Sequence, residues 1–104
     1  MSSYNIEITE PAERDLFENG YYISKELKES DIAKKVIERI SKVIFDLEEK
    51  PHRYSLVSDK RLATQGIRKL IVENYIVFYY ISEEYTTVTI IRILYSRRDW
   101  VNLL

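Results

Sequence analysis

The side chains in this 104-residue chain that could do chemistry are mostly cations and aromatic rings in its second half. Arginine and lysine bind phosphate or carboxylate groups, and tyrosine and tryptophan combine a large apolar ring with a hydrogen-bonding group. Such a set suits the binding of carboxylate or phosphate groups on another macromolecule. Its members are Arg61, Arg68, Lys69, Arg92, Tyr95, Arg97, Arg98 and Trp100.

Arg92 is the most informative of these residues because it lies within an apolar alternating segment. The alternation predicts that it shares one strand face with Val88, Ile90 and Leu94. Its guanidinium must then reach solvent beside them or pair with an anion, either a carboxylate or a phosphate. The simplest interpretation is that it pairs with an acidic residue of this chain and that other arginines nearby are surface charges.

Several other chemistries are excluded by composition. The chain has no cysteine, only one histidine and two glycines, so it lacks thiolate chemistry, a histidine-rich zinc site and a glycine-rich phosphate loop. His52 follows Pro51, and we interpret it as a loop histidine bonded to solvent or backbone rather than as a general base. We therefore expect a protein without a metal or a cofactor.

Charge and hydropathy limit the partners. A formal net charge of -1 gives no overall attraction to nucleic acid, so any RNA or DNA contact would need a local cationic patch. The apolar runs are shorter than the roughly 20 residues that span a bilayer, and the first residues lack the pattern of a signal peptide. The expectation is a cytoplasmic protein with no membrane partner.

Two helices are predicted after a strand over Tyr4–Thr9. The first begins at Glu10-Pro11, because proline is favoured at the start of a helix. Its apolar stripe follows helical spacing: Ala12, Leu16, Gly20, Ile23 and Leu27. The second is capped by Ser30 or Asp31 and ends at Pro51. Because the connection between them is short, they should form an antiparallel hairpin.

The second half of the chain predicts three strands, over Ile67–Val72, Ile76–Ser82 and Thr87–Tyr95. Residues 51–66 before them show no period and are expected to form a long loop. The middle strand is apolar on both faces, so it should be central and covered on both sides. The resulting fold is α+β, a single domain over residues 1–104 of order β-α-α-β-β-β, with a helical hairpin on one face of a mainly antiparallel sheet.

The opposite face of that sheet is where we expect function. Trp100, Leu103 and Leu104 either fold back onto it or leave an apolar patch for another chain. The sequence does not decide between these two outcomes.

Three segments together resemble the RelE/ParE superfamily of toxins. They are ITEPAERDL near the start, GIRKLIVENYIVFYY in the middle and TVTIIRILYSRRDW near the end. None is a catalytic signature, and the resemblance rests on their order and separation over essentially the whole chain. It implies the β-α-α-β-β-β fold and a growth-arresting toxin of a type II toxin–antitoxin pair, neutralised by a small cognate antitoxin.

Within the superfamily, RelE-like members are ribosome-dependent mRNA endonucleases. If this chain is similar to them, its catalytic set is Arg61, Arg68, Arg92, Tyr95 and Arg97. Arg97 falls near a functional arginine of those members, whereas the tyrosine that they carry a few residues later is replaced here by Leu103. Tyr95 is then the candidate that could replace this tyrosine as the general acid.

ParE-like members poison DNA gyrase instead, and they more often carry a histidine in the stretch around Tyr95. We favour this type, because ribosome-directed members are typically strongly basic and this chain is slightly acidic. The contact surface for the target or antitoxin is then expected in the tail: Arg97, Arg98, Asp99, Trp100 and Leu103.

Two further expectations concern partners. We expect the antitoxin to use the exposed sheet face and the groove beside the helical hairpin, and the oligomeric state stays open between a homodimer and a hetero-oligomer with the antitoxin. A third functional alternative is a degenerate toxin that binds its antitoxin but arrests nothing.

Overall fold

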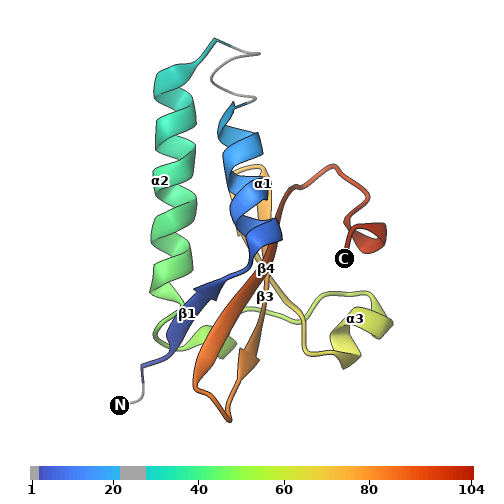
Figure 1. Cartoon of the computed structure of the whole chain (residues 1–104). Coiled ribbons are helices and arrows are strands. Elements are labelled where there is room, and N and C mark those ends of the chain that lie inside the picture. The colour runs from blue at the N-terminus through green and yellow to red at the C-terminus, as the bar shows by residue number, and fades with distance from the viewer. Residues whose placement is uncertain (1–2, 22–27) are drawn as a thin grey trace.

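The computed structural model describes residues 3–21 and 28–104. The elements, shown in Figure 1, are β1 (Asn5–Ile8), α1 (Glu10–Tyr21), α2 (Ser30–Asp46), the 3-10 turn η2 (Pro51–Arg53), α3 (Lys60–Thr64), β2 (Arg68–Val72), β3 (Tyr75–Ser82), β4 (Thr87–Tyr95) and the 3-10 turn η3 (Trp100–Asn102). The order β-α-α-β-β-β is confirmed. Of the predicted stripe on the first helix, Ile23 and Leu27 lie outside the described residues.

The four strands form one mixed sheet in the order β1-β4-β3-β2. β3 pairs antiparallel with both β2 and β4, which makes it an inner strand as its apolar sequence predicted. β1 lies parallel to β4 and reaches only as far as the pair Ile8 and Ile90. Within residues 3–21 and 28–104, the second half of β4 therefore has no neighbouring strand on that side.

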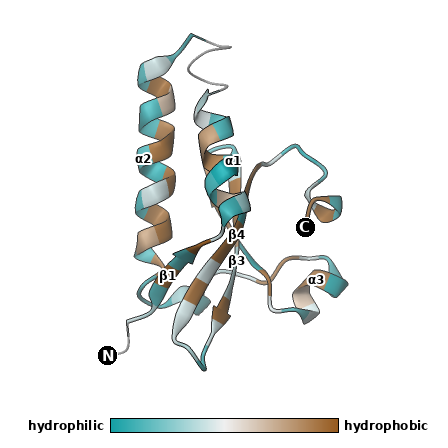
Figure 2. Cartoon of the chain, in the orientation of Figure 1, coloured by the Kyte–Doolittle hydropathy of each residue, from teal (hydrophilic) through white to brown (hydrophobic). Residues whose placement is uncertain are grey.

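Both faces of the sheet are covered by apolar residues. On the helix face, α1 and α2 pack on side chains such as Val77, Tyr79 and Ile93. On the opposite face, which we call the open face, a smaller cluster forms around Phe78 and Leu94. Figure 2 shows hydrophobic residues in the C-terminal turn as well as along α2. The C-terminal tail thus supplies part of the second layer.

The helix starts follow local capping chemistry. The Thr9 hydroxyl accepts a hydrogen bond from the Ala12 amide at 3.2 Å, which satisfies one of the free donors at the start of α1. Pro11 is the second helical residue. α2 begins at Ser30 with Glu29 at the cap position, so the cap lies one residue before the predicted pair.

The prediction of a long loop over residues 51–66 was wrong, because this stretch contains η2 and α3. α3 is only five residues long but has both ends satisfied. The Asp59 carboxylate accepts the Leu62 amide at 3.0 Å. Gly66 follows with φ +82, and the amides of Gly66 and Ile67 donate to the carbonyls of Ala63 and Leu62. This is a Schellman ending, which glycine favours.

The predicted face of Arg92 was also wrong in part. Tyr79 pairs with Ile90 but Phe78 pairs with Arg92, so Ile91 is an extra residue in β4. Such a β-bulge shifts the alternation of side chains by one position. Val88 and Ile90 consequently face the helices, whereas Arg92 and Leu94 lie on the open face.

Candidate functional site

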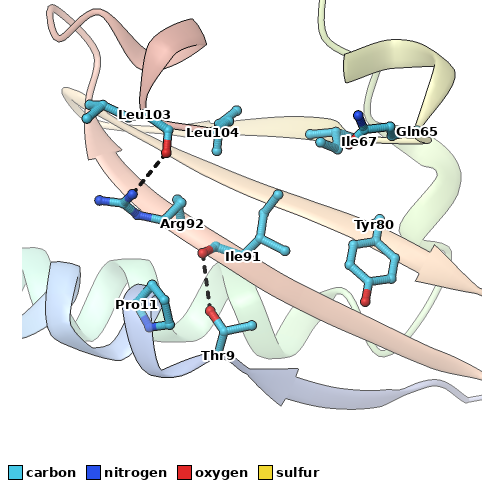
Figure 3. Close-up of a pocket in the computed structure, with 9 residues that line it drawn as sticks. All are labelled: Thr9, Pro11, Gln65, Ile67, Tyr80, Ile91, Arg92, Leu103 and Leu104. Carbon is cyan, nitrogen blue, oxygen red and sulfur yellow. Dashed lines mark hydrogen bonds between the residues drawn. The ribbon is translucent and has the colours of Figure 1, made fainter. Parts of the chain in front are cut away.

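A cavity of about 570 Å³ lies on the open face. Its floor comes from Ile67 of the segment before β2, Tyr80 of β3 and Ile91 of β4, while α3 ends beside it at Gln65. The remaining lining residues are Thr9, Pro11, Arg92, Leu103 and Leu104. Figure 3 shows how these side chains gather between the β1–α1 junction and the C-terminal tail. Arg92 is the charged residue among them.

Helix α1 covers the half of the β4 edge that β1 leaves free. The Thr9 hydroxyl donates to the Ile91 carbonyl at 3.1 Å, as Figure 3 shows, and the Asn19 amide donates to the Ile93 carbonyl at 3.3 Å. The Ile93 amide donates to Asp15 Oδ2 at 3.0 Å. The side chains of Thr9 and of α1 thus make the hydrogen bonds that a neighbouring strand would make here, and they protect the edge from pairing with another chain.

Arg92 makes a two-pronged ion pair with Asp15. Its Nε donates to Oδ2 at 2.7 Å and its Nη2 donates to Oδ1 at 2.9 Å. Its Nη1 donates to the Leu103 carbonyl at 3.1 Å. The hydrogen bonds to Asp15 raise the pKa of Arg92 above its usual value, against the opposing effect of burial. The simplest interpretation from the sequence, a partner within this chain, is confirmed.

Two other members of the predicted ribonuclease set lie on the helix face. Arg68 pairs with Tyr79 across the sheet, and its guanidinium donates to the Tyr54 carbonyl at 2.6 Å. Tyr95 pairs with Tyr75, and their rings meet edge to face at 5.7 Å between centroids. Because directly opposite residues point to the same face, both side chains point away from Arg92.

The remaining predicted cations are exposed. Arg61 lies on α3, and Arg97 and Arg98 lie in the turn between β4 and η3. Among residues 3–21 and 28–104, none of these three side chains has a hydrogen bond or an ion pair. They are free to meet an anionic partner.

The tail folds back onto the sheet, which answers the question that the sequence left open. The Trp100 ring lies 5.1 Å from the Phe78 ring, between centroids, and Leu103 and Leu104 pack on the same cluster. Asp99 accepts a hydrogen bond from the Asn102 amide at 2.6 Å, within the tail itself.

A family model described as the ParE toxin of the type II toxin–antitoxin system, parDE, matches residues 6–100. The chain belongs to this toxin family. No curated protein sequence matches the toxin.

Solved structures show that the toxin has a RelE-like fold. The RelBE2 toxin–antitoxin complex from Mycobacterium tuberculosis is 23% identical with a TM-score of 0.68, and the match covers 91% of this chain and 93% of that one. The chromosomal ParDE system of P. aeruginosa is 17% identical with a TM-score of 0.73 over 89% and 96%. A free mutant of the E. coli toxin RelE is 16% identical with a TM-score of 0.69 over 97% and 92%.

The toxin's His52 is held on the surface rather than in a cleft. Its Nε2 lies 2.6 Å from Glu83 Oε1, and the Tyr4 hydroxyl donates to Glu83 Oε2 at 2.9 Å. This hydrogen bond raises the pKa of Tyr4. The cluster lies outside the lining of the open-face cavity. Within the described residues no group of acidic or histidine side chains could hold a metal ion, and no helix could cross a membrane.

Asp15 is the important residue that sequence reasoning missed. It is 6% exposed and stands among the buried residues of α1. The available signal was spacing, because Ala12, Asp15 and Asn19 lie three and four residues apart on one helix face. A carboxylate on the inward face requires a partner, and Arg92 was the candidate at hand.

Proposed function

We propose that this toxin arrests growth by binding a protein target of the DNA gyrase type through its C-terminal segment, rather than by cutting RNA. The observation that carries this proposal is that the ribonuclease set does not converge. Arg68 and Tyr95 lie on the helix face, and Arg92 is neutralised by Asp15 on the open face. Metal-free cleavage needs a base, an acid and a cation around one phosphate.

The C-terminal segment has the composition of a protein-binding surface. Arg97 and Arg98 are exposed and unpaired among the described residues, and Trp100 is partly exposed beside them. Arginine and tryptophan are the residue types that most often dominate binding at protein interfaces. Leu103 contributes apolar area to the same segment, and Asp99 lies between the cations and the ring.

A cognate antitoxin is the partner that membership of this family supports. We propose that the antitoxin also contacts the helical hairpin, where a hollow of about 450 Å³ lies between α1 and α2. Phe17 and Tyr21 line it and are 68% and 63% exposed. Apolar side chains on an amphipathic helix of a partner fit such a groove.

The test of the proposed function is a supercoiling assay with purified gyrase and purified toxin. We expect supercoiling to fall as toxin is added, and we expect equimolar antitoxin to restore it. Full supercoiling at a large molar excess of toxin would remove the proposal. Normal colony growth after induction without the antitoxin would instead favour a degenerate toxin that only binds its antitoxin.

A further inference from the structure

The proposed function leaves one buried charged cluster without a role. The Asp15 side chain is 7% exposed and the Arg92 side chain is 24% exposed. Taking two charges out of water is costly unless they are paired and hydrogen-bonded, and here Asp15 accepts three hydrogen bonds and Arg92 donates three. An ion pair on the surface would have been enough to keep the protein soluble. The burial of the pair between Asp15 and Arg92 therefore calls for a structural or functional reason.

The guanidinium of Arg92 joins three separate segments. It lies on β4, it pairs with Asp15 on α1, and it donates to the Leu103 carbonyl in the tail. Asp15 is itself fixed by the Ile93 amide. Because the carboxylate is fixed and the pairing has two prongs, the guanidinium plane is fixed as well. Its third bond goes to the Leu103 carbonyl of the tail, as Figure 3 shows. A fixed guanidinium therefore restrains the position of that carbonyl.

Among the described residues, the tail makes few other hydrogen bonds to the sheet. The amides of Leu103 and Leu104 both donate to the Trp100 carbonyl, so these bonds stay within the segment. Apolar contact is also incomplete, because Trp100, Leu103 and Leu104 are only partly buried. Partial burial of three side chains must offset the entropy lost when a terminal segment is ordered. The hydrogen bond from Arg92 to the Leu103 carbonyl therefore contributes a large part of the free energy that keeps the tail docked on the sheet.

We propose that Arg92 is a positioning residue that holds the C-terminal segment, residues 97–104, docked against the open face. It does so through its simultaneous bonds to Asp15 and Leu103. This inference rests on the proposed function in one respect, because the docked segment presents Arg97, Arg98 and Trp100 to the target. A segment that is ordered before binding loses less entropy when it binds. The bonds of Arg92 to Asp15 and Leu103, which we call the tie, therefore strengthen the contact with the target although Arg92 does not touch the target.

Trp100 makes the tie measurable, because it is the only tryptophan of the chain. Arg92→Lys keeps a positive charge beside Asp15 but loses the fork that reaches Leu103. We expect its tryptophan emission to shift toward that of the unfolded chain. We also expect acrylamide quenching to increase by about twofold or more, because local undocking exposes the ring. Asp15→Asn should change both signals in the same direction.

The matched control is Arg39→Lys, the same substitution at the exposed ion pair between Arg39 and Glu73. It should leave the Trp100 signals unchanged. Far-UV circular dichroism identifies any variant that fails to fold. If Asp15→Asn fails to fold, Arg92→Lys alone decides whether Arg92 docks the tail. Wild-type emission and quenching in folded Arg92→Lys would overturn the proposal.

The functional readout separates this inference from the proposed function. In the supercoiling assay we expect Arg92→Lys to need about tenfold more toxin for the same inhibition, with Arg39→Lys unchanged. Unaltered potency with an altered Trp100 signal would overturn the claim that the tie serves target binding. If the wild-type toxin does not inhibit gyrase, the proposed function fails, and the fluorescence of Trp100 still decides whether Arg92 docks the tail.

Discussion

At the scale of single residues, charge and burial separate side chains that the sequence groups together. Seven arginines and lysines follow residue 59, yet only some remain available for a partner. Arg92 is paired with Asp15, and Arg68 donates a hydrogen bond to the backbone carbonyl of Tyr54. Arg97 and Arg98 stay exposed. Residue type therefore identifies candidates, and the partner of each decides its role.

The two free arginines of the tail provide the sharpest functional variant. Arg97→Glu with Arg98→Glu should weaken gyrase inhibition by at least about tenfold, roughly 1.4 kcal/mol, because interface arginines often dominate binding. Dose–response curves in the supercoiling assay measure this. The control is Lys34→Glu with Lys35→Glu, the same charge change at exposed positions of α2. Equal loss in both double variants would point to net charge and not to the tail.

Tyr79 gives a prediction about pH. It is fully buried, its hydroxyl donates to the Pro51 carbonyl at 2.7 Å, and burial raises its pKa to about 12. The unfolded chain loses this proton near pH 10, so the folded state is favoured fully below about pH 10 and loses this advantage as pH rises toward about 12. The loss amounts to about 2–3 kcal/mol for two pKa units.

Tyr79→Phe should abolish that part of the pH dependence. At pH 8 it should cost about 1–2 kcal/mol, because the Pro51 carbonyl loses its buried partner. Urea unfolding of both proteins at pH 8 and pH 11 measures the difference, and the other tyrosines cancel in the comparison. An identical decline in stability for the two proteins would show that Tyr79 titrates normally.

At the scale of elements, the short helix α3 depends on its two ends. Gly66 adopts φ +82, which a side chain disfavours, although no atom beyond its two chain neighbours lies within 4 Å of where its Cβ would be. Gly66→Ala should therefore destabilise the toxin by about 1 kcal/mol through backbone strain alone. Urea unfolding provides the value. A stability equal to that of the wild type would mean that the segment can end α3 in another way.

Most elements could be predicted from the sequence, and the exceptions have physical causes. The hydrophobic periodicity of α2, β3 and β4 extends over enough residues to be recognised, so these elements were predicted from the sequence. α3 was missed because five residues give no period, although Asp59 and Gly66 were visible as end signals. The β-bulge at Ile91 could not be predicted, because no residue in an apolar run indicates which position lacks a pairing partner on the neighbouring strand.

The site was predicted less completely than the fold. The sequence identified Arg92 and the tail, including its return to the sheet as one of two outcomes. It did not place Arg68 and Tyr95 on the helix face, because that placement depends on strand register. It also gave no sign that α1 would complete the edge of β4, since this requires the parallel strand β1 to end at Ile8.

At the scale of the whole molecule, the toxin combines a RelE-like fold with an open face on which the described residues form no converged cationic centre. The cavity there is lined mainly by apolar side chains, and its one arginine is already paired. The net charge of -1 agrees with this arrangement, because strong binding to a polynucleotide depends on neutralising several phosphates. These features are the reason why we propose a protein target for this toxin.

The most direct test of this account is primer extension on mRNA from cells whose growth has just been arrested by induction of the toxin. We expect arrested growth with intact transcripts, since Arg92 is engaged by Asp15 on the open face, whereas Arg68 and Tyr95 point to the helix face. Codon-linked cuts that appear with the wild type, and disappear in Arg97→Glu, would contradict it.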